Sequence, residues 1–446
     1  MRRFAKPPAG RAITRRTLLR GSVIAGATAA VCGIGRSQPS RPAEGFRVIR
    51  AARANAALRG PELAATAIWG FDGAVPGPTL RLGRGEEVKV RLINELDEPT
   101  TVHWHGVRIA NAMDGVPVLT QTPVAPGQSF DYRFVAPDAG TFWYHAQFNA
   151  PTQISRGLYG ALIIDEAEPI DVDRDVALVL GDWRLAKGGT LAEAAAASPR
   201  EDADALRSHL TINGLPALDI PVRTNERVRL RVVNAANARV LALRLERHRA
   251  VVMAIDGEPA EPFEARDGRF ALGPGNRIDL FVDTMLEPGA IANLVADDLG
   301  ADAPIARLVY EAGPPARPQP RTDWKPLPAN PLPERMDFEH ALKLDMPLGV
   351  MDATKPLLSI KRGRAVMLGF VNRSAASYAM HVHGHHFRLL DRMDDGWKPF
   401  WLDTVVVPGG QTFRIAFVGD NPGKWLIQGT ALDGTTPPTA QWFEVQ

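Results

Sequence analysis

Most of the histidines that could do chemistry are concentrated in two short strings. Six of the ten lie in residues 103–106 (HWHG) and 381–386 (HVHGHH). Alternate residues of a β-strand point to the same side, so each His-x-His would present two imidazoles on one face. Clustered imidazoles suit copper, zinc, iron or nickel. One such pair is weak evidence because core packing explains most of them. Two pairs at equivalent places of a repeat favour a metal site over an empty, vestigial cluster.

A third string adds one more histidine. Residues 140–147 (GTFWYHAQ) contain His145, and residues 421–430 (NPGKWLIQGT) are their counterpart later in the chain. Aligning the glycines of the two strings puts His145 opposite Gln428. The sequence therefore predicts a metal centre on five histidines, namely His103, His105, His145, His381 and His383.

Repeated strand patterns must position these histidines. Residues 85–94, 225–234 and 363–372 alternate apolar and polar side chains, end on asparagine and recur about every 140 residues. Such alternation marks strands with one buried face. In each unit a Pro-Gly turn then precedes a second alternating strand. We expect an all-β protein of three β-sandwich domains, with bounds 43–168, 169–313 and 334–446, and a proline-rich linker over 314–333. The one helical pattern lies near 190–206.

The N-terminus is typical of a targeting segment. Residues 1–42 contain nine basic and no acidic residues, with Arg15-Arg16 before an apolar stretch over 21–35. This pattern predicts a twin-arginine signal peptide and a periplasmic protein; a basic disordered arm followed by a helix is the alternative. The stretch is too short to span a bilayer stably, and no later window is apolar enough. We therefore expect no membrane span after signal removal.

Removing residues 1–42 changes the charge and the thiol content. It leaves 43 basic and 50 acidic residues, a net charge of −7. The mature chain therefore lacks the excess of basic residues that is typical of nucleic-acid-binding proteins. The single cysteine, Cys32, lies within the removed segment. A mature chain without thiols excludes disulfides and thiolate metal sites.

The motifs together resemble those of multicopper oxidases, the family of laccases, bilirubin oxidases and cuprous oxidases. HWHG, Asp114-Gly115 and GTFWYH resemble the first domain, LTINGLP and GPGNRIDL the middle domain, and HVHGHHF and NPGKW the third. The likeness covers nearly the whole chain after residue 45. It implies three cupredoxin-like Greek-key β-sandwich domains, with copper between the first and the third.

The departures from the family pattern matter as much. The family's blue, type 1 copper uses His, Cys and His, and the matching positions here are Tyr378, Gly429 and Gly434. We expect no blue copper. Five of the eight cluster histidines remain, and the other three matching positions are Gln147, Gln428 and Thr430.

The resemblance also implies a role for each remaining ligand. His103 and His381 match both ligands of the type 2 copper, and His105 and His145 match two of the three ligands of one type 3 copper. Only His383 remains for the other. We expect one or two copper ions, with another divalent metal as the alternative.

The sequence also predicts the role or the exposure of four further residues near these motifs. Asp114 matches the family acid that helps deliver protons to oxygen, and is the predicted catalytic residue. A structural role is expected for Asp403. His385 should pack structurally, and His386 should be exposed.

Three functions follow from this pattern. The first is an exported copper-binding protein that could react with dioxygen or a small reductant. Ordinary laccase turnover is not expected, because the blue copper that accepts electrons from the substrate in this family is missing. The alternative is a copper-free periplasmic scaffold that binds protein partners, resembling the cell-division member of the family. The third is a zinc-type hydrolytic site.

Overall fold

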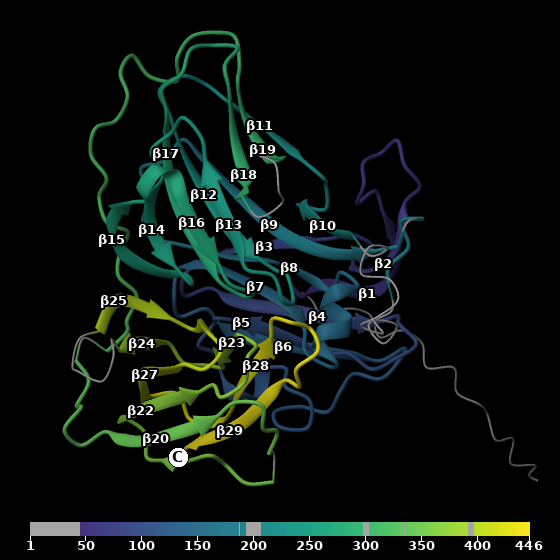
Figure 1. Ribbon diagram of the computed structural model, residues 1–446, viewed down its shortest axis with the longest axis vertical. Coiled ribbons are helices and arrows are strands. Elements are labelled where there is room, and N and C mark those ends of the chain that lie inside the picture. Colours follow the sequence, from purple (N-terminus) through teal and green to yellow (C-terminus); the bar gives the residue numbers. More distant parts are fainter. Residues whose placement is uncertain are drawn as a thin grey trace, which may run out of the picture. The chain divides into compact units, whose positions relative to one another are not determined.

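The fold is built almost entirely from β-strands. The computed structural model describes residues 45–186, 188–192, 207–297, 303–333, 335–352, 354–390 and 397–446. Six sheets pair into three β-sandwiches, which confirms the predicted all-β class (Figure 1). Within the described ranges no helix has the length and apolar character needed to cross a membrane.

The first sandwich consists of two four-stranded sheets, in the orders β2-β1-β4-β6 and β3-β8-β7-β5. Side chains from both sheets, among them Trp104 and Tyr132, are fully buried between them. The elements are β1 (Arg47–Ala56), β2 (Thr66–Phe71), β3 (Gly77–Gly83), β4 (Glu87–Asn94), β5 (Val102–His105), η1 (Asn111–Met113), β6 (Ser129–Val135), β7 (Gly140–Ala146), α1 (Ala150–Ser155) and β8 (Tyr159–Asp165).

The second sandwich has sheets in the orders β10-β9-β12-β17-β14-β15 and β11-β19-β18-β13-β16. An aliphatic core that includes Leu230 and Leu243 fills it. The elements are β9 (Arg174–Leu185), β10 (Arg207–Ile212), β11 (Leu218–Val222), β12 (Glu226–Asn234), β13 (Leu241–Leu245), β14 (Val251–Ile255), β15 (Glu258–Glu264), η2 (Arg266–Gly268), β16 (Arg269–Leu272), β17 (Arg277–Thr284), β18 (Ile291–Ala296) and β19 (Ala303–Tyr310).

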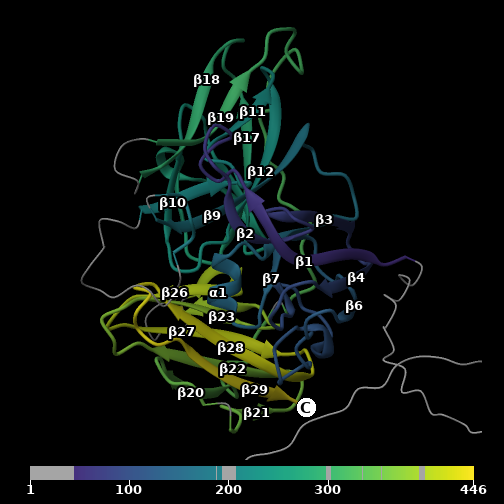
Figure 2. The same cartoon turned by 90° about the vertical axis from the view of Figure 1, so that its right-hand side faces the viewer.

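The third sandwich has sheets in the orders β20-β22-β27-β24-β25 and β21-β29-β28-β23-β26 (Figure 2). Its core includes Phe370 and Trp425. The elements are β20 (Leu342–Pro347), β21 (Ser359–Ile360), β22 (Arg364–Val371), β23 (Tyr378–Val382), β24 (Phe387–Leu390), β25 (Trp397–Leu402), β26 (Thr404–Val407), β27 (Thr412–Gly419), β28 (Gly423–Ala431) and β29 (Thr439–Val445).

The repeated sequence patterns correspond to repeated strand pairings. The three predicted alternating segments are β4, β12 and β22. Each is antiparallel to the strand after the Pro-Gly turn, which is β6, β17 or β27. Each also pairs in parallel with the first strand of its unit, which is β1, β9 or β20. The sequence repeat is therefore a repeat of topology.

The asparagine that ends each repeated strand has a structural role. Asn94, Asn234 and Asn372 are all buried, at 0–2% exposure. Each amide nitrogen donates to a carbonyl oxygen four or five residues later and to at least one more carbonyl oxygen further along the chain. Each amide oxygen accepts from the backbone N–H two residues later. A buried amide satisfied at both ends fixes the chain where it leaves the strand.

One strand departs from the expected single buried face. Every residue of β12 is buried, including the polar positions Arg227, Arg229 and Arg231. Arg229 and Arg231 bond to carboxylates of residues 165–175 and to Asp279. The outer face of this sheet is thus covered by charged groups in pairs rather than by solvent.

Other expectations lie partly outside the described residues. The signal peptide and residues 193–206 of the predicted helix fall there, and the domain bounds stay predictions. The described part of 311–341 contains no helix or strand. It is nevertheless held to the second sandwich, since Arg321 pairs with Asp171 and Asp173, and Trp324 donates to Asp283.

Candidate metal centre

Five histidines of the first and third sandwiches lie together in the interior. His103 and His105 belong to β5, His145 to β7 and His381 to β23, and His383 follows β23 directly. None is more than 4% exposed. His103 is directly opposite His145 in the β5–β7 register, and the rings of His105 and His381 stack with centroids 3.7 Å apart. The fold therefore brings all five predicted ligands together.

The rings of His103 and His381 face each other with their unprotonated nitrogens. His103 Nδ1 lies 2.9 Å from the Asp114 carbonyl oxygen, and His381 Nδ1 lies 2.9 Å from that of Asp403. A carbonyl oxygen only accepts, so each Nδ1 must donate and each Nε2 of the neutral ring carries a lone pair. The two Nε2 atoms are 3.3 Å apart. Two facing lone pairs repel unless a cation lies between them.

His105 and His145 form a second pair of the same kind. His145 Nδ1 donates to the Ala146 carbonyl oxygen at 3.0 Å, which leaves the lone pair on Nε2. The Thr404 hydroxyl donates to Asp403 and so accepts from His105 Nε2 at 2.9 Å. The lone pair of His105 is then on Nδ1, 3.3 Å from His145 Nε2. Both pairs thus offer nitrogen ligands to an ion between them.

His383 is oriented by Asp114. Its Nδ1 donates to the carboxylate at 3.0 Å, while its Nε2 is buried and has no hydrogen-bond partner among the described residues. Asp114 also lies 3.1 Å from His103 Nδ1. Burial acts to raise the pKa of Asp114, but His383 and His103 outweigh it and hold the pKa well below its ordinary value. The ionised carboxylate orients two of the five rings as an outer-shell group does.

Burial also favours the uncharged form of the rings. It lowers the pKa of His105, His145 and His381 below the usual 6.5, and that of His383 to about 3. Neutral imidazole is the form that binds metal, so these rings are available as ligands at pH 7 without losing a proton.

The three positions without histidine lie on one side of the centre. Gln428 is opposite His381 in the β23–β28 register, just as His145 is opposite His103 in the first sandwich. The amide of Gln147 donates to Gln428 Oε1 at 2.7 Å. A cavity of about 240 Å³ is lined by Gln147, Gln428, Thr430 and three of the histidines, His105, His145 and His381.

The three positions predicted to correspond to blue-copper ligands have structural roles instead. The hydroxyl of Tyr378 donates to the Pro437 carbonyl oxygen at 2.8 Å. A side chain at Gly429 would collide with Met380. Gly434 is a turn residue with φ +67°. None of the three offers a ligand atom of the kind a blue copper requires.

Three residues beside the centre test expectations drawn from the sequence. Asp403 bonds to Arg277 through both oxygens and approaches His105 and His381, so it is structural as expected and also orients ligands. Burial acts to raise its pKa, but Arg277 keeps that pKa well below its ordinary value. His386 was expected to be exposed, and this was wrong, since it is 4% exposed. His385 packs against three aromatic rings, as expected: Phe417, Trp425 and Phe443.

Comparisons with known proteins agree with this architecture. Family models described as multicopper oxidase match residues 55–169, 174–295 and 328–431. The structure of a multicopper oxidase from Pseudomonas thermotolerans is 32% identical, with a TM-score of 0.79, over 90% of this chain and 99% of the other. Lac15, from a marine microbial metagenome, is 34% identical, with a TM-score of 0.77, over 89% and 99%. The multicopper oxidase MmcO of Mycobacterium tuberculosis is 29% identical over 90% of this chain and 88% of its own length.

Three cupredoxin-like sandwiches with a histidine centre define the class of protein. The chain belongs to the multicopper oxidase family. Family membership implies a copper cofactor, which the donor set fits, because five buried imidazoles lie together and imidazole nitrogen is a suitable copper ligand.

Proposed function

We propose that this chain is an exported copper-binding protein that holds one or two copper ions in the histidine centre and has no blue copper. The observation that carries the proposal is the pair of N···N distances of 3.3 Å, each between two nitrogens that cannot both donate. The proposed ligands are His103, His105, His145, His381 and His383, with Asp114 as the acid that orients them.

The two facing pairs of histidines would each hold a separate ion. His103 and His381 would share one ion, and His105 and His145 would share a second. Beside them lies the Nε2 of His383, which has no hydrogen-bond partner in the described part of the chain. Bound copper would supply one-electron redox chemistry between Cu(I) and Cu(II). The residues of this chain fix the tautomers of the rings and exclude water from the buried side, and burial keeps His105, His145, His381 and His383 neutral.

The absence of a blue copper limits the activity. Tyr378, Gly429 and Gly434 provide no suitable ligand, so electrons have no route in from a surface copper. The 240 Å³ cavity instead gives a small reductant or dioxygen direct access to the histidines. We therefore expect slow oxidation of small reductants at most, and no ordinary laccase turnover.

The test is the metal content of the mature protein, with electron paramagnetic resonance of any copper found. We expect one or two coppers per chain, a type 2 signal and no blue absorption. The double variant His103→Asn/His381→Asn should lose the type 2 signal, whereas His340→Asn, at an exposed histidine, should keep it. A wild-type chain that binds no copper when offered it would leave the copper-free scaffold as the better function. Preferential retention of zinc would favour the hydrolytic alternative.

We also propose export through the twin-arginine pathway to the periplasm, on the basis of Arg15-Arg16 and the apolar stretch that follows. Changing Arg15 and Arg16 to lysine should retain the protein in the cytoplasm, as seen by cell fractionation. Changing Arg2 and Arg3 to lysine is the matched control. Export of the Arg15/Arg16 variant at the wild-type level would contradict the proposal.

A further inference from the structure

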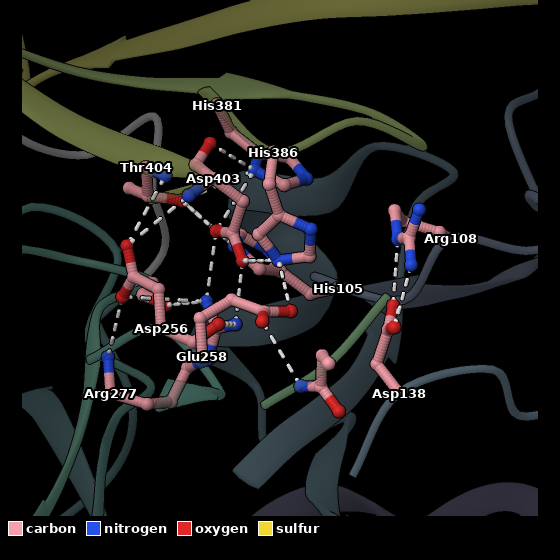
Figure 3. Close-up of polar contacts among 12 residues, drawn as sticks. His105, Arg108, Asp138, Asp256, Glu258, Arg277, His381, His386, Asp403 and Thr404 are labelled. Carbon is pink, nitrogen blue, oxygen red and sulfur yellow. Dashed lines mark hydrogen bonds and ion pairs between the residues drawn. The ribbon is translucent and has the colours of Figure 1, made fainter. Parts of the chain in front are cut away.

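A second group of metal-ligand residues lies beside the histidine centre. Asp138, Glu258 and His386 each offer one ligand atom, and these three atoms all lie within 4.8 Å of one another. Asp138 precedes β7, Glu258 begins β15 and His386 precedes β24, so each sandwich contributes one residue. We call these three residues the junction cluster. Figure 3 shows them with their charged neighbours.

We propose that the junction cluster is a second cation site that binds a divalent transition-metal ion such as Zn²⁺, separate from the histidine centre. This inference does not depend on the proposed function, because none of the three residues is among the copper ligands proposed above.

The first support for a cation site is that buried polar atoms of the junction cluster lack hydrogen-bond partners among the described residues. Both ring nitrogens of His386 and the Oε1 of Glu258 lack a hydrogen-bond partner among the described residues, although these residues are only 4% and 3% exposed. Their closest approach is 3.6 Å, from His386 Nε2 to Glu258 Oε1, which is too long for a hydrogen bond. Buried polar atoms are rarely left without partners, so an unsatisfied ring facing an unsatisfied carboxylate indicates an additional ligand.

The remaining bonds of the cluster leave room for an ion. The Oε2 of Glu258 accepts from the Asn330 amide at 3.0 Å, which holds the carboxylate and leaves Oε1 free. Asp138 accepts from Arg108 at 2.7 and 2.8 Å, and each of its oxygens keeps a second acceptor site. Ligand atoms of one ion at about 2.1 Å lie roughly 3–4 Å apart, so small movements would complete the coordination.

Charge balance is the second, independent support. Four carboxylates with at most 3% exposure surround this junction, against two guanidinium groups, those of Arg108 and Arg277. Burial raises the pKa of Glu258 well above its ordinary value and raises that of Asp256 as well, so a divalent cation at the junction cluster would offset the cost of keeping these carboxylates ionised. The four acids are Asp138, Asp256, Glu258 and Asp403.

The ligand types indicate which cation would bind. One imidazole with two carboxylates suits zinc, manganese or iron better than calcium or magnesium, which prefer oxygen ligands in larger number or keep several waters. Such an ion would join residues from all three sandwiches, so its effect would be structural. Asp403 separates it from the histidine centre, lying 3.7 Å from His386 Nε2 and 3.3 Å from His105 Nε2.

The experiment removes the histidine centre so that only the second site can respond. The mature chain carrying His103→Asn, His105→Asn, His145→Asn and His381→Asn, which removes both facing pairs, is titrated with Zn²⁺, and bound zinc per chain is measured after gel filtration. Co²⁺ serves as a second probe, because its visible absorption reports a mixed nitrogen and oxygen ligand set. We expect one Zn²⁺ per chain, and a higher melting temperature when it binds.

Two added substitutions test the ligands one at a time. Glu258→Gln keeps the shape of the side chain, and His386→Asn removes the imidazole; each should weaken zinc binding at least tenfold and abolish the zinc-dependent rise in melting temperature. His340→Asn is the exposed control and should change neither. The proposal would be overturned if the parent chain failed to bind zinc. It would also be overturned if the Glu258→Gln and His386→Asn variants bound zinc as tightly as the parent chain does. In that case protons on the carboxylates balance the buried charge.

In the chain with an intact histidine centre, the same variants separate the two proposals. Glu258→Gln should leave the copper content and the paramagnetic signal unchanged. Loss of copper from this variant would mean that the junction cluster is part of the histidine centre, which also overturns the proposal.

Discussion

At the scale of single residues, backbone carbonyl groups decide which nitrogen of each ring faces inward. The carbonyl oxygens of Asp114, Ala146 and Asp403 accept from the Nδ1 atoms of His103, His145 and His381. Each of these rings must therefore direct its Nε2 lone pair into the centre. A side-chain substitution at any of these three residues would leave its backbone carbonyl oxygen in place. The orientation of the rings therefore does not depend on which side chain these residues have.

The Asp114 carboxylate is the exception, because its contribution can be removed. Asp114→Asn removes the negative charge and one of the two acceptor oxygens, so an NH2 group faces the ring N–H of His383 or of His103. We expect copper affinity to fall by about tenfold to a hundredfold. Competition with a chelator of known affinity measures this. Asp337→Asn, at an exposed acid, is the control, and an unchanged affinity in Asp114→Asn would contradict the role assigned to this acid.

A pH dependence of stability follows from the buried ring of His385. Burial lowers its pKa to about 4, against about 6.5 in the unfolded chain. Between these values the unfolded state binds the extra proton, so stability is retained above pH 6.5 and is lost as the pH falls toward 4. We expect this residue to contribute up to about 1.4 kcal/mol per pH unit in that window.

Urea denaturation in the presence of a chelator, at pH values from 4 to 7, checks this contribution. His385→Gln should make the decline in unfolding free energy shallower, whereas His340→Asn should leave it unchanged. Parallel curves for the wild type and His385→Gln would assign the decline to other groups.

At the scale of elements, the loop after β5 must pass close to a buried ion pair. Gly106 has φ +86°, and a Cβ there would collide with the guanidinium of Arg277 and the carboxylate of Asp403. Any side chain at this position would therefore suffer both a strained backbone and a steric clash with the pair.

Gly106→Ala should lower the free energy of unfolding by about 2 kcal/mol or more. Gly127→Ala is the matched control, because its φ of +75° is similar but its Cβ would have open space. The control should cost only about 1 kcal/mol, from the backbone alone. Equal losses in chemical denaturation would show that the clash contributes nothing.

At the scale of the whole molecule, charged pairs join the first two sandwiches. Asp279 on β17 accepts from Arg229 at 2.6 Å and from the hydroxyl of Thr141 on β7 at 2.6 Å. Arg229 also pairs with Glu166 at 2.8 Å. All these side chains are largely removed from solvent, so removing one partner leaves a buried charge without its counterion.

Asp279→Asn should therefore destabilise the protein by about 3 kcal/mol. Asp219→Asn breaks a similar two-bond pair with Arg307, but Asp219 is 52% exposed, and the cost should be below about 1 kcal/mol. The difference between the two variants in denaturant midpoint measures the contribution of burial. Similar midpoints would mean that Glu166 or water compensates for the lost carboxylate.

The sequence by itself determined the fold class and the ligand candidates. Period-two alternation identified the strands β4, β12 and β22, and the repeat of about 140 residues identified three units, because both signals are local. His-x-His spacing predicted four of the five candidate ligands for the same reason, since such a pair on a strand needs no knowledge of its partner, and the string over 140–147 predicted His145. The expectation that the mature chain has no thiolate site depended only on the position of Cys32 within the predicted signal peptide.

Only the tertiary structure decided what lies between the sandwiches. The alternation of β12 could not reveal that its arginines are buried, because the pattern describes one sandwich and not the neighbour that covers it. The burial of His386, wrongly expected to be exposed, has the same cause. The junction cluster joins residues more than 100 positions apart in sequence, and each looks like an ordinary surface residue within its own strand or loop. Such a site exists only through contacts between domains, which no local pattern specifies.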